Sequence, residues 1–150
     1  RGWVTLVHVD LLHYRTAVAG VVDDLWQQRR QAHVAANLQA TAGEEFFNVG
    51  LIMFSKKEKF IRVKTHLCEE KFRMMACKTE YEDVRKHLLS FENIAKGEKS
   101  AGAIAQMDIP ERFRWLTAVK SSIIQTSRPH PGASNDLSKT FDRLFDELVM

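Results

Sequence analysis

Two neighbouring segments with different hydrophobic patterns constrain the fold of this chain most strongly. The first, Phe46 to Phe54 (FFNVGLIMF), is a largely apolar run of strand length. In the second, Lys59 to Leu67 (KFIRVKTHL), mainly apolar side chains alternate with basic ones, as in a strand with one solvated face. Only the polar residues 55–58 separate them, which is a connection of hairpin length. The two segments therefore predict an antiparallel hairpin over residues 46–67 whose first strand lies in the middle of a sheet.

Helix signals follow this hairpin along the chain. A capping box of the form T-x-x-E predicts a helix over residues 79–96, which Gly97 ends. The motif D-x-P-E at residues 108–111 predicts the start of a second helix. Asn135 or Asp136 caps a closing helix with one apolar face.

The connections between these helices have patterns of their own. Residues 98–106 (EKSAGAIAQ) are small and polar, which predicts a loop. Residues 120–127 (KSSIIQTS) predict a further strand, although neither of its faces is cleanly apolar. Residues 128–132 (RPHPG) are expected to be irregular, because both prolines lack an amide donor and have a fixed φ.

Composition changes sharply near Gly43. The residues before it contain no lysine, glutamate or phenylalanine, and the residues after it contain all nine phenylalanines. Residues 3–9 (WVTLVHV) predict a strand, and residues 16–42 carry apolar side chains at helical spacing, which predicts a helix. The sequence thus predicts a boundary of origin or of structure, between an atypical N-terminal segment, 1–42, and a single domain over 43–150.

Together these elements predict an α+β fold. A small antiparallel sheet consists of the hairpin 46–67, the strand 120–127 and the candidate strand 3–9, with helices packed on one side. The chain of 150 residues is 45% hydrophobic, which is enough for one globular core. Two cysteines cannot form a disulfide scaffold, and no apolar run reaches the roughly 20 residues of a membrane span, so a cytoplasmic protein is expected.

The sequence assigns no catalytic residue, metal or cofactor. It contains no glycine-rich phosphate loop, no nucleophile-elbow motif and no H-E-x-x-H zinc motif. His8, Asp10 and His13 do not favour a metal site, because such sites need three or four convergent ligands.

Residues 112–130 stand out because they combine arginine, tryptophan, hydroxyl and imidazole side chains. Arginine and tryptophan often dominate the energetics of interfaces, so this segment predicts a surface that binds a partner or an anion. The candidate residues are Asn48, Arg112, Arg114, Trp115, Gln125, Arg128 and His130. An edge strand with a solvated face, followed by a structural proline loop, would produce the same pattern.

Two other functions stay open beside this interaction module. A basic hairpin, together with the arginines above, could bind nucleic acid or a phosphate ligand, although the net charge of +3 is a weak field. The basic residues of the hairpin are Lys56, Lys57, Lys59, Arg62 and Lys64. Ser127, with His130 as its base, could serve a hydrolase or transferase, but the sequence supplies no third group to orient them.

Two stretches resemble a known family. Residues 45–54 (EFFNVGLIMF) resemble the E-F-x-N-V-G strand of the bacterial domain-of-unknown-function 3037 family. Residues 112–118 (RFRWLTA) and the turn at 127–132 (SRPHPG) resemble its second signature. The resemblance covers about residues 44–150 and leaves the first 42 unmatched. Compared with the family, this segment is expected to be an insertion or a gene-level artefact. The resemblance implies no established activity, but family members are often encoded beside a HipA-like kinase, so it implies a small partner or regulator of that kinase.

Overall fold

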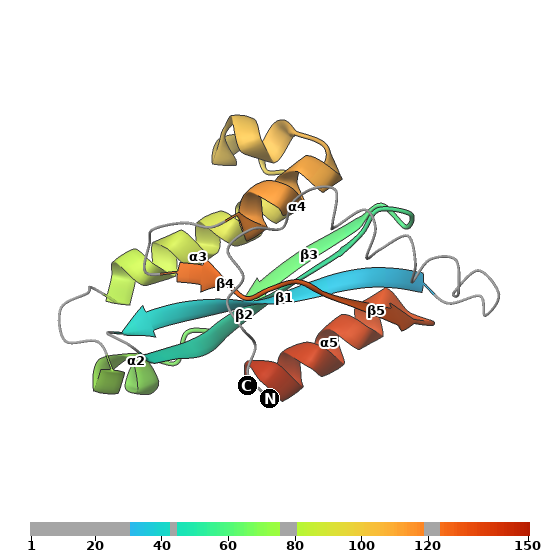
Figure 1. Cartoon of the computed structure of the whole chain (residues 1–150). Helices are drawn as coiled ribbons and strands as arrows, with labels where there is room; N and C mark the ends of the chain where they lie inside the picture. Colours follow the sequence, from blue (N-terminus) through green and yellow to red (C-terminus); the bar gives the residue numbers. More distant parts are fainter. Residues whose placement is uncertain (1–30, 43–44, 76–80, 119–123) are drawn as a thin grey trace.

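Two long antiparallel strands form the middle of the sheet. The computed structural model describes residues 31–42, 45–75, 81–118 and 124–150. Within these ranges five strands form one antiparallel sheet in the order β3-β2-β1-β4, and β5 also pairs with β1 (Figure 1). The strands are β1 (Gln31–Ala42), β2 (Glu45–Ser55), β3 (Phe60–Thr65), β4 (Ile124–Thr126) and β5 (His130–Ser134). The predicted α+β class with a small antiparallel sheet is confirmed.

The predicted hairpin is formed by β2 and β3. The strands pair over residues 50–55 and 60–65, and the turn between them holds Lys59 in the left-handed region at a φ of 49°. β2 lies between β3 and β1, and its residues 49–55 are buried, as expected for a strand that is apolar on both faces.

Strand β1 overturns part of the prediction for the N-terminal segment. Residues 31–42 were expected to end a helix over 16–42, but they form the central strand, paired with β2 on one side and with β4 and β5 on the other. Their many alanines favour a helix locally, yet long-range pairing overrides this weak preference. β1 is therefore the strand that lies beside β2, and the change of composition near Gly43 falls between two paired strands. The strand predicted at residues 3–9 lies outside the described residues.

Helices cover both faces of the sheet, whereas the sequence led us to expect them on one side. Helices α3 (Tyr81–Lys96) and α4 (Ile109–Thr117) pack on one face, and α5 (Leu137–Leu148) packs on the other (Figure 1). Helix α2 (Glu69–Met75) contributes Phe72 to the first of these layers. The strict alternation of β3 and the apolar character of β2 follow from this arrangement, because β2 faces a helix layer on each side.

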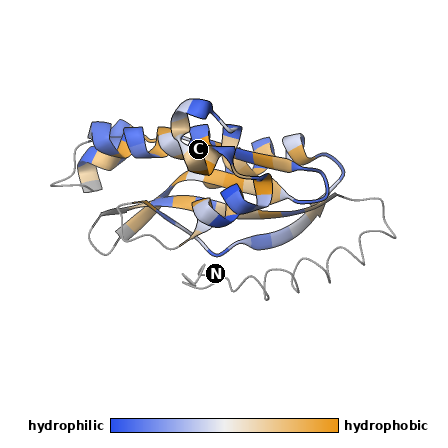
Figure 2. Ribbon diagram, turned by 90° about the horizontal axis from the view of Figure 1, so that it is seen from above, coloured by the Kyte–Doolittle hydropathy of each residue, from blue (hydrophilic) through white to orange (hydrophobic). Residues whose placement is uncertain are grey.

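Each helix layer has its own hydrophobic core. On the α3 and α4 side, β1 contributes Val34, Ala36, Leu38 and Ala40, and the ring of Phe54 stacks on that of Phe113 at 4.7 Å. On the α5 side, β2 contributes two residues that pack against three from the helix: Leu51, Met53, Leu137, Phe141 and Phe145. Figure 2 shows hydrophobic residues along the central strands and a mixture of hydrophilic and hydrophobic residues along the helices, as expected for helices that bury one side.

The helix ends follow the predicted signals. Gly97, at a φ of 75°, follows α3, and the Asp108 side chain accepts a hydrogen bond from the amide of Glu111 at the start of α4. Asp136, rather than Asn135, caps α5. The loop expected over 98–106 contains two short 3₁₀ turns, η1 (Lys99–Ala101) and η2 (Ala103–Gln106). No helix among the described residues is long and apolar enough to cross a membrane.

The proline segment also differs from its prediction. Residues 128–132 were expected to be irregular, but His130–Ser134 form β5, which pairs with residues 31–35 of β1. A proline is tolerated there because, among the described strands, β5 pairs with β1 alone and so lies at an edge, where the backbone groups on one side of the strand need no partner strand. Of the strand predicted over 120–127, the described part is β4.

Candidate functional site

The α5 side of β1 carries polar residues where a central strand would normally be apolar. His33, Asn37 and Gln39 are all buried there, with only Ala35 between them in the alternating pattern. The opposite side of the same strand is entirely apolar. Buried polar side chains need hydrogen-bond partners, so each of these three requires a separate explanation.

Two irregularities in strand pairing flank this part of β1. Between Leu38–Gly50 and Gln39–Asn48, the strand β2 has one extra residue, Val49. On the other side, Thr126 pairs with Leu38 and His130 with Ala35, so four steps of the β4–β5 strand oppose three steps of β1. Each irregularity is a β-bulge, which bends a strand and redirects its side chains.

Ser127 holds the second bulge in place. Its backbone amide donates to the carbonyl oxygen of Asn37 at 2.9 Å, and its Oγ accepts from the amide of Asn37 at the same distance. The hydroxyl donates in turn to the carbonyl oxygen of Arg128 at 3.4 Å. Both backbone polar groups of Asn37 are thereby paired, although the regular ladder is interrupted at this residue.

A chain of amide hydrogen bonds crosses the sheet beside this bulge. Gln39 Nε2 donates to Asn48 Oδ1 at 3.2 Å, and Asn48 Nδ2 donates to the carbonyl oxygen of Leu148 at 2.9 Å. Gln125 lies directly opposite Gln39 in the register, so its side chain lies on the same side of the sheet. The Asn48 side chain therefore links β2 to the C-terminal end of α5 by a hydrogen bond.

A groove opens between α5 and the strands β1 and β5, and we call it the α5 groove. Its volume is about 330 Å³. Polar and apolar side chains share its lining, among them His33, Asn37, His130, Arg143, Leu144 and Leu148. Gly132 lies opposite His33, and a Cβ at that position would come within 2.7 Å of His33 Nε2. A glycine is thus needed there to leave space for the imidazole.

The predicted surface residues separate into two groups. Three of them lie on α4, on the far face of the sheet from the α5 groove: Arg112, Arg114 and Trp115. Asn48, Gln125 and His130 lie on the α5 side, and Arg128 is exposed in the link between β4 and β5. The structure therefore does not bring the seven residues into one site.

The three α4 residues have different roles in the fold. Arg112 Nη1 donates to the carbonyl oxygens of Ile94 and Ala95, at 3.2 and 2.8 Å, and so binds the C-terminal end of α3. Arg114 is exposed and pairs with Glu111 one turn earlier. Trp115 is 37% exposed. Arg112 is a structural residue, whereas the other two lie at the surface.

His130 is the residue of the α5 groove whose protonation the surroundings shift. Partial burial lowers the pKa of its imidazole below 6.5, and the neighbouring positive charge of Arg128 lowers it further. The neutral form of the His130 imidazole is therefore favoured at pH 7.

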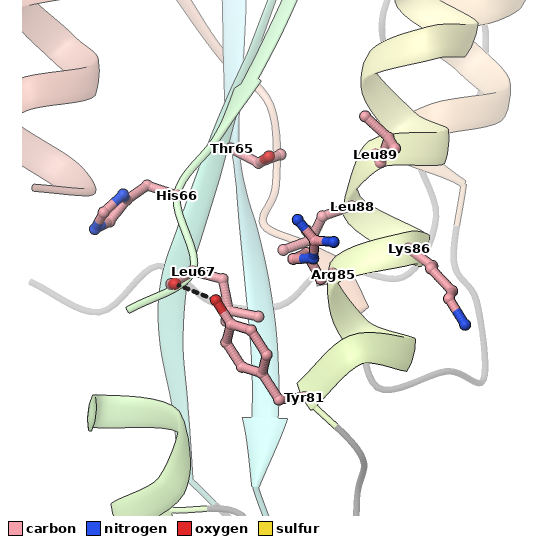
Figure 3. A pocket seen from close by; sticks show the side chains of 8 residues that line it. All are labelled: Thr65, His66, Leu67, Tyr81, Arg85, Lys86, Leu88 and Leu89. Carbon is pink, nitrogen blue, oxygen red and sulfur yellow. Dashed lines mark hydrogen bonds between the residues drawn. The ribbon is translucent and has the colours of Figure 1, made fainter. Parts of the chain in front are cut away.

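A second hollow lies between the end of β3 and the start of α3 (Figure 3). Tyr81 closes part of it by donating from its hydroxyl to the carbonyl oxygen of Leu67 at 3.2 Å. Figure 3 shows His66 on the side of the strand away from α3, and Lys86 pointing away from the hollow. Arg85 pairs with Glu82. The charged groups here do not converge, so we do not take this hollow as the candidate site.

The described residues also bear on metal binding. Among them, no group of three or more His, Cys, Asp or Glu side chains could hold a metal ion. His8, Asp10 and His13, which the sequence did not favour as ligands, lie outside the described residues.

The fold and the α5 groove define a small α+β domain with a ligand-sized groove on one face of its sheet. A family model described as "Protein of unknown function (DUF3037)" matches residues 32–149, and the chain belongs to this family. The family expected from the sequence is thus confirmed, and the match includes nearly all of β1. No curated protein and no solved structure gives a significant match.

Sequence reasoning missed the residues that form the floor of the groove. His33, Asn37 and Gln39 lie in the segment predicted to be helical. The signal was present as a period of two, since Val34, Ala36, Leu38 and Ala40 alternate with the polar positions. No local pattern in the sequence assigns Arg143 to the groove, because the sequence does not show which strands α5 packs against.

Proposed function

We propose that this protein is a non-catalytic interaction module that binds a partner protein through the exposed face of α4. A HipA-like kinase is the first candidate partner, on the basis of the family association alone. The observation that supports this surface is the exposure of Trp115. On the same helix Phe113 is only 3% exposed and stacks on Phe54, so α4 has already supplied its aromatic anchor to the core.

The chemistry of this surface fits a protein partner. An exposed tryptophan beside an exposed arginine matches the residue types that most often carry binding energy at protein interfaces. Arg114 keeps a carboxylate partner, Glu111, so its charge is neutralised in the free protein and can exchange to a carboxylate on the partner.

The two alternative functions find less support in the geometry. Arg62 forms an ion pair with Asp142 at 3.1 Å and lies over the Phe141 ring, and Lys64 lies over the Phe145 ring. These two charges are held against α5, which weakens the basic hairpin as a nucleic-acid surface.

The hydrolase alternative depends on Ser127. Its side chain is buried at 4% exposure, and its hydroxyl donates to a backbone carbonyl rather than to a base. A nucleophile must be accessible and must give its proton to a base, so this arrangement argues against that role.

The proposal is tested with the purified 150-residue chain and a purified HipA-like kinase. We expect Trp115→Ala and Arg114→Ala each to weaken binding, measured by surface plasmon resonance, by about tenfold or more. The matched control is Arg85→Ala, because Arg85 is also an exposed helical arginine that pairs with a glutamate three residues earlier. Kinase binding that both α4 variants leave unchanged would refute the surface, and the absence of any binding would refute the partner.

A further inference from the structure

The carboxamide of Asn37 is buried at the floor of the α5 groove. Asn37 is only 2% exposed, and its side-chain Oδ1 has no hydrogen-bond partner among the described residues. The neighbouring amide at position 39 differs, because Gln39 donates to Asn48. Since Ser127 already pairs the backbone of Asn37, the side chain is not needed to hold the bulge. Its oxygen is thus an acceptor presented to the groove without a donor.

The groove has the size and lining of a small-molecule site. Its volume of about 330 Å³ lies at the lower end of the range for ligand pockets. Leu51, Leu144, Leu148 and Pro131 supply apolar walls, and the ionisable residues in its lining are His33, His130 and Arg143. No acidic side chain belongs to the described lining, so the groove favours an anionic group near its rim.

Arg143 is the fixed positive charge at this rim. Within the described part of the chain its Nη1 contacts Glu147, at 3.1 and 3.5 Å to the two carboxylate oxygens, and no contact uses its Nη2 or Nε. A guanidinium can bind a second carboxylate through such remaining donors. An exposed ion pair of this kind is weak, so a ligand can compete with it.

We propose that the α5 groove binds a compact ligand that combines a carboxylate, an adjacent amide N–H and an apolar side chain. The N–H would donate to Asn37 Oδ1, the carboxylate would pair with Arg143, and the apolar side chain would lie against Leu144 and Leu148. An N-acylated amino acid and the C-terminal residue of a peptide share this chemistry. The site lies on the opposite face of the sheet from α4 and does not depend on the proposed kinase interaction.

Calorimetric titration of the full-length protein tests this site with three probes. They are N-acetyl-L-leucine, its carboxamide N-acetyl-L-leucinamide, and a short acetylated peptide that ends in leucine. We expect the two carboxylates to bind and the carboxamide to bind at least about tenfold more weakly, because it cannot pair with Arg143. Tighter binding of the peptide would identify a chain terminus as the ligand, and equal or weaker binding would identify a free acylated amino acid.

Two variants and a control assign the binding to the groove. Asn37→Leu removes the acceptor and should reduce the affinity by about tenfold or more while leaving the unfolding temperature unchanged or higher. Arg143→Gln should lower the affinity of the two carboxylate probes to about that of the carboxamide probe. Lys139→Gln, an exposed change on the same helix outside the groove lining, should have no effect.

The outcomes that overturn the proposal are equally definite. Absence of binding by every probe at millimolar concentration refutes it, as does binding that neither Asn37→Leu nor Arg143→Gln changes. If Asn37→Leu fails to fold, the discrimination between carboxylate and carboxamide by Arg143→Gln still decides the question, because Arg143 is exposed and its loss leaves the core of α5 intact. A failure here leaves the kinase measurement with the α4 variants unaffected.

Discussion

Arg112 provides the most direct test of how the α4 residues divide between structure and surface. The sequence placed it in a binding surface, but its guanidinium donates two hydrogen bonds to the last carbonyls of α3. A hydrogen bond from a charged group contributes about 1.5–3 kcal/mol, and a cation at a helix C-terminus adds about 0.3–1 kcal/mol. The two hydrogen bonds are only partly buried, so water can replace part of what the guanidinium supplies. We therefore expect Arg112→Ala to cost about 2 kcal/mol net.

The matched comparison is Arg114→Ala, two residues away on the same helix. Arg114 makes an exposed pair with Glu111, which is worth about 0–1 kcal/mol. In a chain of this length, the loss at Arg112 corresponds to an unfolding temperature lower by roughly 4–8 °C. Thermal unfolding followed by circular dichroism, with urea unfolding as a second measure, checks both values. If Arg112→Ala unfolds within about 1 °C of Arg114→Ala, the assignment of Arg112 to the fold is wrong.

Two further predictions concern the sheet and its edge. Gly50→Ala should destabilise the protein by about 1–3 kcal/mol in urea unfolding, because the added Cβ would lie 2.9 Å from the carbonyl oxygen of Lys64, and a stability equal to wild type would show that the strands can separate there. Burial, and then Arg128, lower the pKa of His130, so the folded state binds its proton less readily than the unfolded state and loses stability as pH falls below 6.5. Urea unfolding at pH 7.5 and pH 5 should show a smaller loss in His130→Gln, and an equal loss in both proteins would contradict the shift.

The parts of the fold that the sequence predicts are those with local signals. The hairpin follows from alternation over consecutive residues, and α4 and α5 begin at aspartate caps that bond within their own first turn. β1 has only a weak local signal, because its alanines suit a helix and obscure the alternation of apolar and polar residues. Its central place depends on pairing with β4 and β5, which lie far along the chain. β5 was missed for a related reason. A proline is excluded from a central strand but accepted at an edge, and only the complete sheet defines the edge.

The candidate site was predicted only in part because residue type does not determine which face a side chain occupies. Asn48, Gln125 and His130 were selected for their polarity, and the register of β1 places all three on the α5 side. Arg112 was selected on the same grounds and points into the end of α3. Both outcomes depend on contacts between residues far apart in the sequence, and no local pattern predicts which residues will meet.

Asn37 is one of the described residues whose buried polar side chain folding alone does not account for. Its buried oxygen, without a donor among the described residues, costs about 1–3 kcal/mol in a protein whose total stability is expected to be about 5–15 kcal/mol. Its backbone groups are satisfied by Ser127, so a leucine of similar size would remove this cost without disturbing the bulge. Sequences that fold well break local rules mainly where function requires it. A single substitution thus separates the two accounts: if Asn37→Leu raises stability and abolishes ligand binding, the penalty belongs to a site, whereas if it lowers stability, the carboxamide has a structural partner.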